Sequence, residues 1–223
     1  MKIEFVSGTL VPTTSPIAYV IDQDALPASL EAVVTEGAKA SRFSGKAGQL
    51  HETFVSRDGA VVRLALAGAG EAGGKDRAAA LEKAGAAITA KYLASGEQSV
   101  TLDFTGTSYS AHEVASILLG ARLRGWRYDT YRTKLSDEQK VSLATIKVAG
   151  ASAGAEAAWE VEAALSDGIE FTRELVTEPA NVLYPESFVA RAKARLEAAG
   201  VKVRTLDEAE MAQLGMGALL GVA

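Results

Sequence analysis

The sequence predicts an α/β protein with a first domain built on a mixed sheet flanked by helices. Short apolar runs alternate with helical patterns over residues 1–150, and two of these runs are joined by Asp58-Gly59. A long helical pattern with one apolar face follows and stops before Pro179. We therefore expect a domain at 1–150, a linking helix at 151–178, and the incomplete start of an α/β domain at 179–223.

Composition excludes several classes of function. The chain has 223 residues, 48% of them apolar, so it can bury a core. A net charge of −5 disfavours nucleic-acid or anionic-membrane binding, and the lack of cysteine excludes disulfides and thiolate metal sites. We expect no signal peptide at the N-terminus, where an acidic residue comes early and no long apolar run follows, and no apolar run reaches the roughly 20 residues that span a bilayer. A cytoplasmic protein is expected.

The strands of the first domain follow from apolar runs and turn residues. Alternation marks the first strand, a continuous apolar run of the doubly buried type marks the second, and Asp58-Gly59 predicts a hairpin between the third and fourth. Because helical patterns separate most strands while this hairpin is antiparallel, the sheet should be mixed. The expected strands are 2–7, 17–21, 51–56, 61–67, 99–104 and 142–148.

Three helices are expected in the same domain, at roughly 30–37, 75–94 and 110–125. The first should end at Gly37. The third should begin with a capping box, in which Ser110 and Glu113 bond each other's backbone amides. Gly125 is expected just past its end, in the left-handed conformation.

Beyond residue 150 the pattern predicts helices and one short strand. The linking helix should bury a stripe of residues three or four apart, namely Ala158, Val161, Leu165, Ile169, Thr172 and Val176. A helix beginning at Pro185 should bury Phe188, Ala192, Leu196 and Ala199 and end at Gly200, before a strand at 201–206 and a helix capped by Asp207 and Glu210. One strand with two helices cannot bury both of its faces, so the chain is expected to be a fragment.

Four groups of residues are candidate sites. The loop Gly68–Lys75 lies between a strand and a helix, so it is either a tight turn or a phosphate or nucleotide site; its spacing fits neither known phosphate fingerprint. His51 and His112 lack metal-ligand spacing, and His112 should be exposed. A basic, aromatic segment is either an anion or nucleic-acid patch or, as we favour, an ordinary surface or subunit contact. It comprises Arg122, Arg124, Arg127, Arg132 and Lys134 with Trp126, Tyr128 and Tyr131.

The junction at Glu178-Pro179-Ala180-Asn181 is the last candidate. Glu178 and Asn181 are polar residues beside a proline, which could suggest a catalytic role. Turn chemistry explains the same residues, because Asn bonds nearby backbone well and Pro fixes the bend. We favour the turn interpretation.

The chain resembles the leucine aminopeptidase (cytosol aminopeptidase) family of two-metal peptidases over nearly its whole length. The resemblance rests on Arg173–Asn181 (RELVTEPAN), Pro185-Glu186, Val201–Val203 and Leu214–Ala223 (LGMGALLGVA), with similar segments in the same order at Phe43–Gly48, Leu118–Gly120, Trp126–Asp129 and Tyr131–Lys134. The family often has Ser or Thr where this chain has Tyr184. A hydroxyl cap should therefore be missing, at a cost of about 1 kcal/mol.

The resemblance implies a macro-domain-like N-terminal domain, a linking helix and the start of a peptidase domain. It further implies that the full enzyme is a homohexamer that cleaves N-terminal residues from peptides with two divalent ions, Mn²⁺ or Zn²⁺. The family's metal ligands and catalytic arginine lie in motifs absent from this chain, so we expect no catalytic, metal-binding or substrate-binding residue here. The expected fragment is inactive alone and either monomeric or dimeric. The alternative is a stand-alone macro-like module that binds a nucleotide or another partner.

Overall fold

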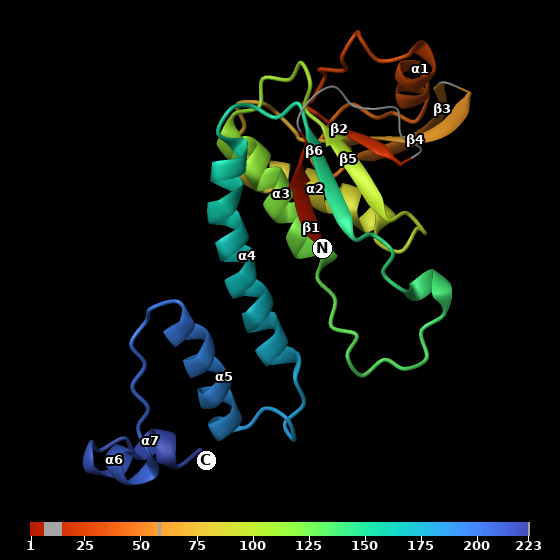
Figure 1. Cartoon of the computed structure of the whole chain (residues 1–223). Helices are drawn as coiled ribbons and strands as arrows, with labels where there is room; N and C mark the ends of the chain where they lie inside the picture. Colours follow the sequence, from red (N-terminus) through yellow and green to blue (C-terminus); the bar gives the residue numbers. More distant parts are fainter. Residues whose placement is uncertain (7–14, 58, 223) are drawn as a thin grey trace. The chain divides into compact units, whose positions relative to one another are not determined.

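The computed structural model describes residues 1–6, 15–57 and 59–222, and its central element is a six-stranded sheet of order β1-β6-β5-β2-β4-β3 (Figure 1). Strands β3 and β4 are antiparallel, while the other neighbouring pairs are parallel, which confirms the predicted mixed sheet. The strands are β1 (Lys2–Phe5), β2 (Ile17–Ile21), β3 (Leu50–Arg57), β4 (Ala60–Gly68), β5 (Ser99–Asp103) and β6 (Thr145–Ala149). Ser7 and Asp58, which belong to the expected first strand and hairpin, lie outside the described residues.

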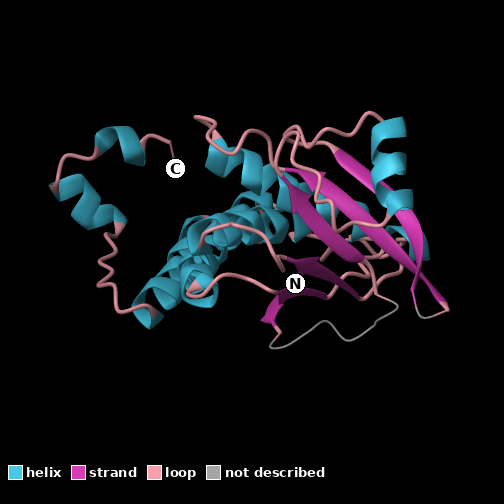
Figure 2. Ribbon diagram, turned by 90° about the horizontal axis from the view of Figure 1, so that it is seen from above, coloured by secondary structure: helices cyan, strands magenta, loops and turns pink. Residues whose placement is uncertain are grey.

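Helices lie on both faces of the sheet (Figure 2), because successive side chains of a strand point to opposite faces. In β2, Ala18 and Val20 join an apolar core formed with α2 (Arg77–Tyr92) and α3 (Ala111–Gly125). Their neighbours on β2 join a second core with α1 (Ala32–Ala40). The continuous apolar run of β2 is therefore buried on both faces, as predicted.

Helices α2 and α3 cross at two buried glycines. A Cβ atom on Gly85 would lie 1.9 Å from the carbonyl oxygen of Ile117, and one on Gly120 would lie 2.0 Å from that of Glu82. Such distances are far inside van der Waals contact, so only glycine fits at either position. The segment Leu118–Gly120 thus has a packing role, because it brings two helix backbones together over the sheet.

Two predicted helix ends are wrong. Helix α1 continues through Gly37 and is followed by Ser41 and by Arg42, whose φ of 59° is left-handed. Gly37 instead packs against His51, whose Nε2 would lie 3.3 Å from an added Cβ atom. Gly125 is the last residue of α3 and is not left-handed, since the chain leaves α3 through Trp126 in an extended conformation. The capping box at Ser110 and Glu113 is confirmed.

The long helix expected after the sheet is α4 (Ala155–Thr177), but the predicted buried stripe is wrong. Val161 is 70% exposed, Leu165 51% and Val176 81%. The buried side contains Trp159 and Ser166 instead, because the helix has apolar or small residues on two sides and packs by the other one. Ala155 and Trp159 join the core beneath α2 and α3.

Backbone contacts divide the chain into Met1–Glu170 and Phe171–Ala223, with the division inside α4. The second unit holds the end of α4, α5 (Pro185–Ala198), α6 (Glu208–Gln213) and α7 (Gly217–Leu220). Over described residues 171–222, Leu175 is the one apolar residue that is buried. The expected buried stripe of α5 is therefore wrong, with Phe188 47% and Leu196 41% exposed.

In the second unit, the predicted helix ends are confirmed, but the predicted strand is not. Residues 201–206 form no strand, because a strand needs a neighbour to pair with and these described residues have none. Gly200 is left-handed, with a φ of 79°, and the capping box of Asp207 and Glu210 is present. At α5, the Tyr184 side chain accepts no hydrogen bond from a backbone amide. Ser187 Oγ accepts a hydrogen bond from the Tyr184 amide at 2.9 Å, which supplies one half of a capping box.

Candidate functional site

The loop Gly68–Lys75 uses its first amides within the protein. The Gly68 amide donates to the carbonyl of Gln49, the Ala69 amide to that of Ile21, and the Gly70 amide to that of Gly45, all at 2.8–2.9 Å. A phosphate cradle needs several free N–H groups that point at one place. The loop's strand end therefore favours a structural turn over a phosphate site.

The loop Gly68–Lys75 packs closely against a second glycine-containing loop, residues 43–49, which precedes β3. An added Cβ atom on Gly68 would lie 2.1 Å from the carbonyl oxygen of Lys46, and one on Gly45 would lie 2.5 Å from that of Asp22. The Gln49 side chain ties the second loop together, since its Oε1 accepts the amides of Ser44 and Lys46 at 2.9 and 3.1 Å. Close backbone packing, which only glycine allows, explains the composition of both loops.

A polar cluster around Arg77 fills the carboxyl end of the central strands. Arg77 Nη1 donates to Asp22 Oδ1 at 2.6 Å, its Nε donates to Glu113 Oε1 at 2.9 Å, and the guanidinium lies 5.4 Å from the centre of the Tyr109 ring. The Tyr109 hydroxyl donates to Asp22 at 3.0 Å. Asp22 follows β2, and Tyr109 precedes the cap of α3, so the cluster joins elements far apart in sequence.

Electrostatics in this cluster favour the charged pair and a neutral phenol. Burial, and then the Asp22 carboxylate, raise the pKa of Tyr109 above its usual range. Burial opposes ionisation of Glu113, but bonds from Ser110 and Arg77 outweigh it and lower the pKa of that carboxyl. The Arg77 guanidinium is thus shared by the carboxylates of Asp22 and Glu113 in a partly buried place. It therefore acts as a structural clamp and is not available to bind an anionic ligand.

Most of the cationic side chains of the basic, aromatic segment contact acids of the same chain. Arg122 donates to Asp167 at 2.5 Å and to Glu170 at 3.0 Å, so it holds α3 against α4. Arg127 and Arg132 both lie near Asp129, at 3.4 and 3.5 Å. Neutralised cations make a poor anion patch, which supports the ordinary-surface interpretation. The rings of Trp126 and Tyr128 stack with centres 6.1 Å apart.

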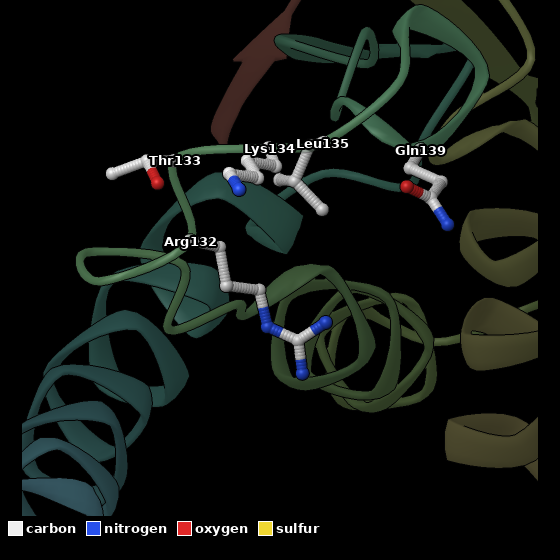
Figure 3. A pocket seen from close by; sticks show the side chains of 5 residues that line it. All are labelled: Arg132, Thr133, Lys134, Leu135 and Gln139. Atoms are coloured by element: carbon white, nitrogen blue, oxygen red, sulfur yellow. The ribbon is translucent and has the colours of Figure 1, made fainter.

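A hollow of about 380 Å³ lies in the same segment, lined by Arg132, Thr133, Lys134, Leu135 and Gln139 (Figure 3). The five side chains in Figure 3 point in different directions and do not converge on one position. Ligand sites place a few polar groups around one point in an apolar cleft. Four of the five lining side chains are exposed, and Leu135 is half-buried.

A second hollow, of about 360 Å³, lies where β1 and β6 end and α4 begins. Its lining includes Phe5, Val148, Ser152 and Glu156, and Glu156 is the one titratable side chain in it. Ser152 Oγ is buried without a hydrogen-bond partner among the described residues. A lone carboxylate beside a serine lacks the base and the oxyanion donors of a nucleophilic site.

The residues do not fit a metal site. His51 lies on β3, where its Nδ1 is 2.9 Å from Ser41 Oγ, and His112 is exposed on α3 as predicted. In the described part of the chain, no three His, Asp or Glu side chains gather closely enough to hold an ion. The shielded carboxylate of Glu52 is already occupied, since it contacts Arg63 and Lys91 at 2.9 and 2.8 Å. That the ligands lie outside this chain stays a prediction.

The junction residues have structural partners. The Glu178 side chain, 7% exposed, lies 3.1 Å from Arg191 of α5, and Arg191 also pairs with Glu174. The Pro179 carbonyl accepts the amides of Val182 and Leu183 at 2.9 Å, which makes the turn. Asn181 is exposed. An ion pair and a proline turn therefore account for the junction, in line with the turn interpretation.

Comparison with known proteins defines the class of protein. The N-terminal domain of the cytosol aminopeptidase family matches residues 13–135, and the catalytic domain of the same family matches residues 170–223. The two matches define a class of protein with a separate N-terminal domain and a catalytic domain. This chain belongs to the cytosol aminopeptidase family, as the resemblance in its sequence predicts.

The curated relatives are longer than this chain. A probable cytosol aminopeptidase of Caulobacter vibrioides is 39% identical over all of this chain, which spans 46% of the relative. That of Afipia carboxidovorans is 41% identical over 85% of this chain, which spans 38% of it. The chain therefore spans less than half the length of these relatives.

Solved structures share the fold. A mutant of tomato leucine aminopeptidase has a TM-score of 0.75 at 18% identity, covering 96% of this chain and 46% of the tomato chain. The bottromycin maturation enzyme BotP in complex with Mn has a TM-score of 0.70 at 25% identity, covering 91% of this chain and 40% of that enzyme. No helix among the described residues is long and apolar enough to cross a membrane.

Proposed function

We propose that this chain is the N-terminal domain, linking helix and catalytic-domain entry of a two-metal leucyl aminopeptidase, and that it does not hydrolyse peptides alone. One observation carries the proposal: two models of the family match in consecutive order, while the chain spans 38–46% of its relatives. In the proposed whole enzyme, two divalent ions, Mn²⁺ or Zn²⁺, activate water and polarise the peptide carbonyl. Peptides are its substrates, a homohexamer its assembly and the cytoplasm its location.

The contacts of the carboxylates in this chain support the proposal that it holds no catalytic metal site of its own. Three of its shielded carboxylates are already engaged by cations: Asp22 by Arg77, Glu52 by Arg63 and Lys91, and Glu178 by Arg191. A carboxylate bonded to a guanidinium is a poor metal ligand, because binding an ion would break a shielded pair. The manganese complex of BotP supports a metal-dependent reaction in the family.

An activity assay tests the proposal. The purified chain is incubated with leucine p-nitroanilide and Mn²⁺ or Zn²⁺, and the released nitroaniline is followed by absorbance. The expected result is no release above buffer, with a full-length relative as the positive control. Release that scales with chain concentration and disappears with a chelator would overturn the proposed inactivity.

The coding frame supplies a second test. We expect coding to continue past Ala223 into a domain that contains a lysine and several carboxylates at metal-ligand spacing. A stop codon directly after Ala223 would contradict the proposal that this chain is part of a longer enzyme. For the alternative, a macro-like module that binds nucleotides, titration with ADP-ribose to millimolar concentration should give no heat, because the amides of Gly68, Ala69 and Gly70 are engaged.

A further inference from the structure

The side chain of His51 on β3 lies against the last turn of α1. Ser41 follows this turn, and its Oγ donates to the Ala38 carbonyl at 2.9 Å and lies 2.9 Å from Nδ1 of His51. The other edge of the imidazole faces Gly37, since an added Cβ atom there would lie 3.3 Å from Nε2 and 3.5 Å from Cε1. Residues 37–41 therefore lie next to both ring nitrogens.

The hydrogen bonds of Ser41 determine which nitrogen of His51 carries the proton. A serine hydroxyl has one hydrogen to donate, and that of Ser41 is donated to Ala38. The hydroxyl oxygen can then only accept a hydrogen bond from His51, so Nδ1 is protonated and Nε2 is not. The opposite tautomer would bury an Nε2–H group that has no acceptor among the described residues, at a desolvation cost. Both observations assign the Nδ1–H tautomer to the folded chain.

A second proton on His51 is unfavourable while α1 stays in place. It would go to Nε2, which is buried without a hydrogen-bond partner among the described residues. An imidazolium has two N–H donors, and burying one of them unpaired costs free energy. Burial accordingly lowers the pKa of His51. Because Gly37 lies against this edge of the ring, water reaches Nε2 when the last turn of α1 moves away. Proton uptake and opening of this turn are therefore linked.

The charged side chains on the surrounding elements do not offset this effect, since burial is the one cause of the lowered pKa of His51. Glu36 and Lys39 pair with each other at 3.1 Å, and Glu52 binds two cations on the opposite face of the sheet. The residue paired with His51 on β4 is Leu66. The charged groups are Glu36 and Lys39 on α1, the exposed Arg42 and Lys46 in the following loop, and Glu52 on β3.

Helix α1 is the less stable of the two elements that His51 connects. It has nine residues and no side-chain cap at its N-terminus, and isolated helices of this length are marginal in water. Strand β3 has eight residues, and all of them pair with β4. Opening the last turn of α1 solvates Nε2 without unpairing the sheet. Proton uptake is therefore expected to open α1 before it opens β3.

We propose that His51 is a pH-sensitive switch, in which a proton on Nε2 releases the last turn of α1 and the residues after it, 37–43, while the sheet stays folded. The open form takes up the proton with the ordinary histidine pKa of about 6.5. The closed form therefore has its full stability above this pH. The opening equilibrium rises as the pH falls below it, by up to about 30-fold at pH 5. The proposal concerns the first unit alone and needs no catalytic activity, so its test is independent of the proposed function.

Nitrogen NMR of the imidazole rings tests the tautomer. The chain contains two histidines, so histidine labelling gives two ring signals, and His112, exposed on α3, is the internal reference. The H51Q variant assigns the two signals. At pH 7.5 the couplings between ring nitrogens and carbon-bound protons should show the Nδ1–H form for His51 and a mixture of both tautomers for His112. The Nε2–H form at His51, or the same mixture as at His112, would overturn the proposal.

Hydrogen exchange of the whole chain tests the opening. The reporters are the amides of Ser41, Arg42 and Phe43, each of which donates to a carbonyl of the last turn of α1. Rates at pH 7.5 and 5 are corrected for the pH dependence of exchange in the unfolded chain. The opening equilibrium of these amides should rise by up to about 30-fold at pH 5. H51Q should abolish this rise, because glutamine takes up no proton, and H112Q is the matched control that should retain it.

Comparison with β5 separates local opening from global unfolding. At pH 5 the three reporter amides should exchange at least about tenfold faster than the amides of β5, because α1 opens while the sheet stays paired. Equal rates would mean that acid acts by global unfolding, and the proposed switch would be wrong. An equal rise in H51Q and H112Q would show that acid opens α1 through another group, which also overturns the proposal.

Discussion

Residues 1–170 and 171–223 use the same local helix signals but differ in what lies beneath them. In the first unit, α2 and α3 bury Leu81, Ile88, Ile117 and Leu118 against a sheet. In the second, α5 and α6 have N-terminal caps but no buried side chain. Capping supplies about 1 kcal/mol per helix, whereas isolated helices of this length are marginal in water. The comparison shows that caps position helices, and that buried area stabilises them.

Hydrogen exchange should show the largest difference between the two units. In the intact chain, amides of β5 should exchange only on global unfolding, while amides of α5 (Pro185–Ala198) should exchange through local opening. We expect protection factors that differ by at least about three orders of magnitude, measured by mass spectrometry after pepsin digestion. Equal protection of β5 and α5 would show that the second unit has stabilising contacts of its own.

Two helical glycines sharpen the comparison within the first unit. G120A should lower the free energy of unfolding by about 2–3 kcal/mol, because its new Cβ atom would lie 2.0 Å from the Glu82 carbonyl and force α2 and α3 apart. G168A is the matched control, since an added Cβ atom there meets nothing within 4 Å and should stabilise the helix by about 0.5–1 kcal/mol. Urea titration measures both. Similar values for the two variants would contradict the close crossing.

The cluster at Arg77 should matter more than any surface pair. R77M leaves Asp22 and Glu113 shielded without their cation, and should cost about 2–3 kcal/mol. The Arg77 side chain is 15% exposed, so solvent screens the pair only in part. R132M is the control, because Arg132 is 64% exposed and its loss should cost under about 0.5 kcal/mol. Thermal or urea unfolding compares them, and a cost for R77M no larger than for R132M would refute the clamp.

The smallest effect should come from His51. Burial lowers the pKa of its imidazole, and Nε2 is shielded without a partner among the described residues. The unfolded chain then takes up a proton at higher pH than the folded chain, so this contribution is present above about pH 6.5 and is lost as pH falls below it. H51Q should show a weaker loss of unfolding free energy between pH 7.5 and 5. An unchanged pH profile would mean that His51 is not involved.

Sequence predicted most of the features that depend on neighbouring residues. The hairpin strands, the capping boxes at Ser110 and Asp207, and the doubly buried run Ile17–Ile21 depend on residues close in the chain. Glycine was harder to interpret, because a sequence does not show whether it serves a left-handed turn or a close contact. Neither Gly37 nor Gly125 is left-handed, and both lie in close contacts, Gly37 with His51 and Gly125 with Met1.

The sequence did not predict which surfaces of the helices and strands pack against each other. Helix α4 carries apolar or small residues on two sides, and periodicity cannot tell which side packs against α3 and the apolar core. The strand expected at 201–206 needed a pairing partner that the pattern could not supply. In the Arg77 cluster, Glu113 lies 36 positions after Arg77 and Asp22 lies 55 positions before it, so no local sequence motif marks the cluster. Acidic residues directly after β2 and at the cap of α3 were the available signal, because parallel strands end at one edge of the sheet.

The interlocked glycine loops also bear on the order of folding. The loop before β3 and the loop after β4 lie at the open end of one hairpin, where Leu50 pairs with Ala67 and the Gly68 amide reaches the Gln49 carbonyl at 2.9 Å. When β3 and β4 have paired, the two loops are already adjacent. Packing them against each other then costs little further chain entropy. This closely packed backbone can therefore form early, from contacts local in sequence, before the parallel strands pair.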